Sequence, residues 1–387
     1  MSQESRPLID ISRDKSALYI HIPFCRHKCA YCDFYSSAGG SRSSEIFGAY
    51  VSAVLNEWHL RRAELPTLPR TIYLGGGTPS LLPIETLSTL IAGLLNDIPR
   101  NRLVEVTIEA NPEDVTSEWL SRMRSMGINR VSIGIQSFHK DELQAVSRRH
   151  SPDDAVRALS TLADGGWNYS ADLIYGLPGQ SVESWCDNLH RLLAFRPPHF
   201  SAYLLSYEPG TPLYIRLNKG TVKEADDSMV SGMYGLLCKA AAEAGYRHYE
   251  ISNFALPGYE AVHNSSYWDL TPYLGLGAGA HSFDKDGIRR FNPNSYQRYI
   301  RSLSAGRLFC EIDEETSRSQ INDFIITALR TSQGLDPKKI PRILRDEFSQ
   351  NMEPLLNEGC VEINGTNIVI PEDLWLTSDA ILRRLIL

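Results

Sequence analysis

The chain has 387 residues, of which 42% are hydrophobic and 22% charged, and its 39 basic and 46 acidic residues give a net charge of −7. Such a composition can bury a large core, which argues against wholesale disorder, and the acidic balance argues against nucleic acid as a partner. No uncharged apolar run approaches the roughly 18 residues of a membrane-spanning helix. Residues 1–17 form a polar leader without the apolar stretch of a signal peptide, so we expect a cytoplasmic protein.

From residue 18 onward, short apolar or β-branched runs alternate with amphipathic stretches. The expected strands are 18–22, 71–74, 105–109, 130–135, 171–174 and 199–204, and the expected helices between them are 44–62, 83–95, 117–126, 152–165 and 181–193. Strands joined by helical crossovers pair in parallel. The pattern leaves a doubly wound sheet and a barrel open, and in both the chemistry lies at the C-terminal ends of the strands.

The pattern changes after residue 205. A turn-rich connector (207–212) and a helix (228–245) lead into an aromatic and glycine-rich segment, and helices are expected again at 319–331, 336–348, 352–358 and 380–387. Asn364-Gly365 between the extended runs 361–363 and 368–370 predicts a hairpin. The predicted organisation is a leader (1–17), an α/β domain (18–245), an aromatic extension (246–310) and a small α-rich C-terminal domain with a hairpin (311–387).

Three of the seven cysteines, Cys25, Cys29 and Cys32, form a C-x3-C-x2-C loop directly after the first expected strand. Three thiolates on one short loop can converge on one soft metal centre. Iron–sulfur clusters commonly take four cysteines, so three would leave one iron open to another ligand. The alternatives are a structural zinc site and unrelated core thiols.

With Tyr31 just before its third cysteine, this loop resembles that of the radical S-adenosylmethionine (SAM) superfamily. The resemblance implies a [4Fe-4S] cluster on Cys25, Cys29 and Cys32, whose fourth iron chelates SAM and whose electron cleaves SAM to a deoxyadenosyl radical. It also implies a partial (β/α)6 barrel, which decides between the two α/β architectures. The expected fold is therefore this barrel followed by the small α-rich C-terminal domain that the pattern predicts.

Further polar and glycine residues fall at the ends of successive expected strands. The run Gly75-Gly76-Gly77-Thr78-Pro79 lacks the Lys-Ser/Thr of a nucleotide-binding P-loop and predicts a tight turn whose backbone can approach a ligand. Taken singly, each polar residue is more often a surface residue than a ligand. Resemblance to the branch of oxygen-independent coproporphyrinogen III dehydrogenases and heme chaperones implies SAM contacts at Tyr19, Gly76, Gly77, Thr78, Glu109, Gln136, Arg148 and Asp172.

The segment His263-Asn264-Ser265-Ser266-Tyr267-Trp268 carries a second candidate site. Taken alone, His263 is better explained as a hydrogen-bonded buried histidine, although a histidine among aromatics can also be the axial ligand of a porphyrin. The segment resembles the signature of the HemW family of heme chaperones, as does 249–254. This implies that His263 helps hold heme, which is passed to respiratory-chain apoproteins with transient docking at the inner face of the membrane.

One position separates the two sister families. The coproporphyrinogen III dehydrogenases carry a further cysteine two residues after the third, where this chain has Phe34. We therefore expect a heme chaperone that holds a [4Fe-4S] cluster, SAM and heme. The alternatives are SAM-dependent oxidative decarboxylation of coproporphyrinogen III and a zinc-stabilised barrel with another small-molecule role.

Overall fold

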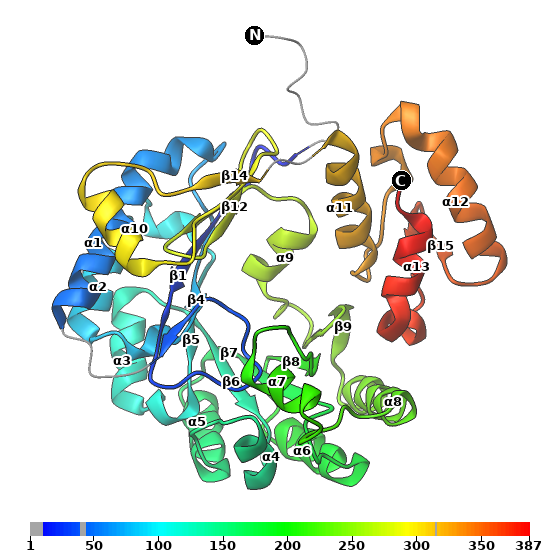
Figure 1. The fold of residues 1–387 in the computed structure, drawn as a ribbon, viewed down its shortest axis with the longest axis horizontal. Helices are drawn as coiled ribbons and strands as arrows, with labels where there is room; N and C mark the ends of the chain where they lie inside the picture. Colours follow the sequence, from blue (N-terminus) through cyan, green and yellow to red (C-terminus); the bar gives the residue numbers. More distant parts are fainter. Residues whose placement is uncertain (1–10, 39–43, 314–315) are drawn as a thin grey trace.

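The computed structural model describes residues 11–38, 44–313 and 316–387, so most of the predicted polar leader lies outside the described residues. Figure 1 shows a curved parallel sheet surrounded by helices, with a separate group of helices at the C-terminal end of the chain.

Six parallel strands form the centre of the sheet, in the order β1-β4-β5-β6-β7-β8. All six predicted strands are present, as β1 (Ala17–Ile22), β4 (Thr71–Gly76), β5 (Glu105–Ala110), β6 (Arg130–Gln136), β7 (Asn168–Tyr175) and β8 (His199–Leu204). Neighbours in sequence are neighbours in the sheet, as helical crossovers require. The fold is the partial (β/α)6 barrel of the prediction.

The crossover helices cover the outside of the barrel. The predicted ones are observed as α1 (Ser44–Arg61), α2 (Ile84–Leu95), α3 (Ser117–Met126), α5 (Pro152–Asp164) and α6 (Val182–Ala194), and the short α4 (Lys140–Ala145) was not predicted. Ser151 and Ser181 begin α5 and α6 as capping boxes, in which the serine hydroxyl accepts a hydrogen bond from the third backbone N–H of the helix.

Residues 247–313 add strands to both sides of the central sheet, so the added strands run past residue 310, where the predicted extension ends. Next to β8 lie β10 (Asn253–Ala255) and β9 (Arg247–Glu250), and next to β1 lie β11 (Tyr273–Leu276), β12 (His281–Phe283), β13 (Arg289–Phe291) and β14 (Glu311–Asp313). The helices α9 (Val262–Trp268) and α10 (Tyr296–Ser304) complete this segment. Strands of three or four residues are too short to show a period of two, which is why the sequence pattern missed them.

The remaining helices are α7 (Pro212–Asn218), α8 (Asp227–Glu243), α11 (Ser317–Leu329), α12 (Arg345–Asn357) and α13 (Ser378–Leu385), with short strands β2 (Phe24–Cys25), β3 (Ser37–Ala38), β15 (Glu362–Asn364) and β16 (Asn367–Val369). β15 and β16 form the predicted hairpin. The predicted break between helices 336–348 and 352–358 is wrong, because Phe348 and Leu355 are buried two turns apart along the single helix α12.

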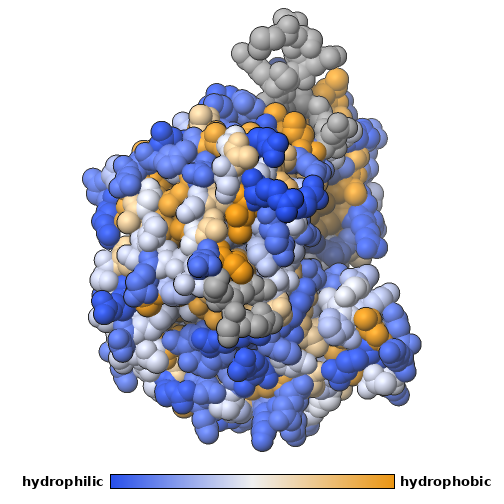
Figure 2. Space-filling view, turned by 60° about the vertical axis from the view of Figure 1, so that its left-hand side comes forward, coloured by the Kyte–Doolittle hydropathy of each residue, from blue (hydrophilic) through white to orange (hydrophobic). Residues whose placement is uncertain are grey.

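The helices α11, α12 and α13 stand together on the β9 side of the barrel, away from α1 and α2 (Figure 1). One continuous hydrophobic core runs from the barrel into this group, so the C-terminal helices pack directly on the barrel. On the face shown in Figure 2, hydrophobic residues are scattered among a majority of hydrophilic ones. None of the helices within the described ranges is both long and apolar enough to span a bilayer.

Candidate cofactor site

The cysteine loop is fixed by backbone hydrogen bonds to distant elements. The N–H of Ala30 donates to the carbonyl of Val146 at 3.0 Å, and the N–H of Leu213 donates to the carbonyl of Ala30 at 2.9 Å. Burial raises the pKa of the Cys32 thiol to about 11, and the negative charges of Cys29 and Cys25 add to this increase. All three cysteines line the same cavity, and the spacing predicts them as ligands of one metal centre.

The glycine turn after β4 is joined to the cysteine loop through backbone contacts. The N–H of Gly77 donates to the carbonyl of Ile22 at 2.8 Å, and the N–H of Thr78 donates to the carbonyl of Phe24 at the same distance. A Cβ on Gly77 would lie 2.7 Å from both of these carbonyl oxygens, so no other residue fits there. The Thr78 hydroxyl also donates to the sulfur of Cys25 at 3.6 Å. The turn therefore helps to position the first cysteine.

Glu109, at the end of β5, receives hydrogen bonds from two cavity residues. The Tyr73 hydroxyl donates to Oε1 at 2.8 Å, and the N–H of Gly76 donates to Oε2 at 3.0 Å. Burial, with a smaller contribution from the charge of Asp172, raises the pKa of Glu109 to about 7. A cationic group bound between Glu109 and Asp172 would offset both the desolvation of Glu109 and its repulsion by Asp172.

Gln136 and Arg148 lie where β6 departs from regular pairing. The strand register shifts between Gly134 and Gln136, and Gln136 has a φ of 64°, which is unusual for a residue with a side chain. Its Oε1 is buried without a hydrogen-bond partner in the described part of the chain. Arg148 donates to the carbonyl of Gly134 at 2.5 Å and to the sulfur of Cys29 at 3.5 Å. Backbone strain and an unpartnered acceptor are typical of a ligand site.

Asp172 lies inside the barrel, where it accepts hydrogen bonds from Ser132 at 3.3 Å and Ser170 at 3.2 Å. Burial raises its pKa. Arg130 is 1% exposed, and its Nε and Nη2 have no hydrogen-bond partner among the described residues. The sequence analysis missed Arg130, although it has the same strand parity as Gln136 and therefore faces the same interior.

These side chains line one cavity of about 520 Å³, a volume in the usual range for small-molecule sites. The cavity brings together most of the predicted residues, namely Cys25, Cys29, Cys32, Tyr31, Gly76, Gly77, Thr78, Glu109, Gln136, Arg148 and Asp172. Tyr19 does not line it, but stacks behind the lining residue Tyr73 with ring centres 6.1 Å apart, and its hydroxyl is 2.9 Å from Nδ1 of His21.

His263 also lies one layer behind the cavity. It is completely buried, with Nδ1 2.9 Å from the Thr71 hydroxyl and Nε2 2.9 Å from the Tyr267 hydroxyl. Its ring stacks on Tyr73 at 5.1 Å, and burial lowers its pKa to about 3, so the imidazole is neutral at pH 7. The carboxylate of Glu105 accepts hydrogen bonds from the first N–H groups of α9, at Val262 and His263, which fixes the helix that carries this histidine.

The mouth of the cavity combines apolar and cationic groups. Phe34 is 63% exposed and Leu204 is 42% exposed, although both line the cavity. Arg26, Lys28 and Arg149 line it as well. Large exposed apolar side chains beside cations fit a ligand with a flat apolar body and anionic substituents.

Residues 19–192 match the radical SAM superfamily. The heme chaperone HemW of Bacillus subtilis is 34% identical over 90% of this chain and 92% of its own length, and HemW of Lactococcus lactis is 33% identical over 90% and 89%. This chain belongs to the HemW family. The structure of the coproporphyrinogen III oxidase HemN from Escherichia coli superposes with a TM-score of 0.79 at 22% identity, over 96% of this chain and 90% of that one, and supports the fold.

Membership of the radical SAM superfamily implies a [4Fe-4S] cluster and SAM as cofactors of the HemW-type barrel. The residues present fit both groups. Three cysteines line the cavity, which also offers the buried carboxylates of Glu109 and Asp172 and the unpartnered amide oxygen of Gln136. A ligand with an ammonium group, a sulfonium and ribose hydroxyls supplies the donors and positive charge that these acceptors lack.

Proposed function

We propose that this protein is a heme chaperone that holds a [4Fe-4S] cluster and SAM in the barrel and heme at the same end, and passes the heme to respiratory-chain apoproteins. The supporting observation is the family membership, together with Phe34 at the position of the additional cysteine. Cys25, Cys29 and Cys32 would hold the cluster. The SAM contacts would come from Tyr31, Gly76, Gly77, Thr78, Glu109, Gln136, Arg148 and Asp172 in the cavity wall, with Tyr19 supporting Tyr73 from behind.

The cavity mouth suits heme because heme has a flat apolar ring and two carboxylate substituents. Phe34 and Leu204 offer apolar contact, while Lys28 and Arg149 offer charge for the carboxylates. Arg26 is paired with Asp114 at 2.7 Å. These groups lie beside the cluster loop, so heme bound there would contact the SAM-binding end of the barrel. Release to a recipient would then occur from the open mouth, with transient docking at the inner face of the membrane.

His263 can act on heme in one of two ways. As an axial ligand it must exchange its hydrogen bond with Tyr267 for a bond to iron, and Tyr73 must move from between it and the cavity. In its present position it supports Tyr73, whose hydroxyl donates to Glu109. The neutral imidazole is the form that a metal requires.

The first test is an anaerobic absorbance titration with heme of the protein, of His263→Ala and of Tyr267→Phe. Saturation near one heme per chain is expected. If His263 is the axial ligand, its removal weakens binding at least tenfold, while Tyr267→Phe retains or strengthens binding because Nε2 is freed. His281→Ala, at an exposed histidine on β12, is the matched control.

Absence of saturable heme binding in the unaltered protein would overturn the proposal. Binding that is equal in the unaltered protein and in His263→Ala would remove His263 from the heme site. SAM-dependent conversion of coproporphyrinogen III under reducing anaerobic conditions would instead favour the dehydrogenase.

A further inference from the structure

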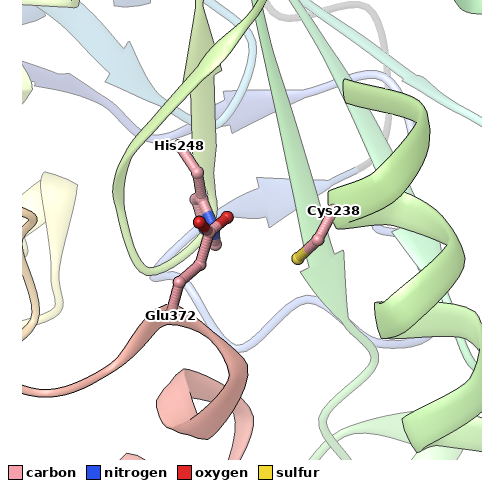
Figure 3. A group of neighbouring side chains, drawn as sticks. All are labelled: Cys238, His248 and Glu372. Atoms are coloured by element: carbon pink, nitrogen blue, oxygen red, sulfur yellow. The ribbon is translucent and has the colours of Figure 1, made fainter. Parts of the chain in front are cut away.

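A second group of metal-ligating side chains lies outside the cavity, where the C-terminal residues pack on the barrel. Cys238 comes from α8, His248 from β9 and Glu372 from the 3-10 turn Glu372–Thr377 that precedes α13. One ligand atom from each residue lies within 4.8 Å of the other two. Figure 3 shows Cys238 pointing from its helix toward the adjacent side chains of His248 and Glu372.

The hydrogen bonds of His248 orient its ring for metal binding. Nε2 is 3.3 Å from the carbonyl oxygen of Ile251, which can only accept, so this nitrogen carries a proton. In the neutral imidazole, Nδ1 then has a lone pair, and it lies 2.8 Å from Oε1 of Glu372. A lone pair facing a carboxylate oxygen requires a cation between them, either a proton or a metal ion. In metal-bound histidines the other ring nitrogen commonly donates to a backbone carbonyl in this way.

The surroundings hold these side chains in place. The His248 ring stacks on Phe254 at 4.1 Å and packs edge-on against Trp375 at 4.4 Å, and its side chain is 4% exposed. The Tyr234 hydroxyl donates to the backbone carbonyl of Glu372 at 3.1 Å. The Glu372 side chain is 55% exposed, which leaves an open side for a water molecule as a fourth ligand.

We propose that Cys238, His248 and Glu372 bind one Zn²⁺ ion. One thiolate, one imidazole and one carboxylate are the ligand types of zinc, whose bonds of about 2.0–2.3 Å place tetrahedral ligand atoms about 3.5 Å apart. To reach that spacing, Nδ1 of His248 and Oε1 of Glu372 would move apart from 2.8 Å, and any longer separation, at most 4.8 Å, would shorten. The ion would join α8 and β9 of the barrel to the start of the C-terminal closing segment, and so fasten the C-terminal helices to the barrel. The proposal does not depend on heme binding.

The test uses full-length protein with an anaerobically reconstituted cluster, so that the loop cysteines are already occupied. The protein is equilibrated with Zn²⁺ and desalted, and zinc and iron are then measured per chain. We expect about one zinc, with X-ray absorption showing a single sulfur ligand at about 2.3 Å. Cys238→Ser and Glu372→Gln should each lower zinc affinity at least tenfold while iron content stays unchanged. Zn²⁺ should raise the unfolding temperature of the unaltered protein and not that of the two variants.

Cys186→Ser is the matched control, because Cys186 is an exposed thiol on α6. It should retain zinc fully. Absence of zinc from the unaltered protein would overturn the proposal, as would zinc retained in Glu372→Gln, a change at a half-exposed side chain that the fold tolerates. Three sulfur ligands in the absorption spectrum would place the zinc in the cysteine loop and would also overturn it.

Discussion

Replacing Glu109 by glutamine should stabilise the protein at alkaline pH while it weakens SAM binding. Glu109 is held against the glycine turn, and burial raises its pKa from the ordinary 4.5 to about 7. The folded state therefore disfavours the carboxylate relative to the unfolded chain. Glutamine has nearly the same shape, can still accept the hydrogen bond from Tyr73 and has no charge to bury. Its NH2 group would face the N–H of Gly76 in place of Oε2, and this cost is present at both pH values.

The magnitude follows from the two pKa values. The difference between 4.5 and about 7 corresponds to about 3 kcal/mol at most. Because the folded pKa is the higher one, this destabilisation is absent below pH 4.5, grows as the pH rises toward 7 and is complete above it. As the pH rises from 5 to 8, the free energy of unfolding of Glu109→Gln should therefore increase by up to about 3 kcal/mol relative to that of the unaltered protein.

The assay is anaerobic thermal unfolding of both proteins at pH 5 and pH 8, without SAM. For a chain of this size the gain corresponds to an increase in unfolding temperature of a few degrees at pH 8. Histidine titration affects both proteins equally and cancels in the difference. Glu118→Gln, on the exposed face of α3, should show no pH-dependent gain. An equal difference between Glu109→Gln and the unaltered protein at both pH values would refute the reasoning.

Three further predictions concern the same site. Cys29→Ser should lose cluster iron and acid-labile sulfide while Cys360→Ser keeps both, and retention of full iron and sulfide in Cys29→Ser would remove it from the ligand set. Gly77→Ala should lower the free energy of unfolding by about 1–3 kcal/mol, because the added Cβ meets backbone oxygens. Gly232→Ala, on α8, places its Cβ in open space and should raise the free energy of unfolding by about 0.5–1 kcal/mol. Urea unfolding of both variants tests this contrast. Asp172→Asn should weaken SAM binding at least tenfold in equilibrium dialysis with unchanged iron content, and an unaltered affinity would exclude it from the SAM site.

The sequence pattern by itself determined the parallel strands and the residues at their C-terminal ends, and the resemblance to the radical SAM superfamily selected the barrel. Hydrophobic runs separated by helices require parallel strands, and parallel strands bring their C-terminal ends together. Cys25, Glu109 and Asp172 could therefore be assigned to one site from their places along the chain. Local turn chemistry also determined the hairpin around Gly365.

Only the tertiary structure decided how segments far apart in sequence meet. The added strands of 247–313 are too short to show a period, and they form because the edges of the central sheet at β8 and β1 offer hydrogen-bonding partners. His263 shows the same limit, since its motif marks it as a candidate but does not reveal its position behind Tyr73. The candidate zinc ligands Cys238, His248 and Glu372 are spread over 134 positions (372 minus 238), so their spacing in the sequence gives no motif. They meet only because the C-terminal segment docks on the barrel.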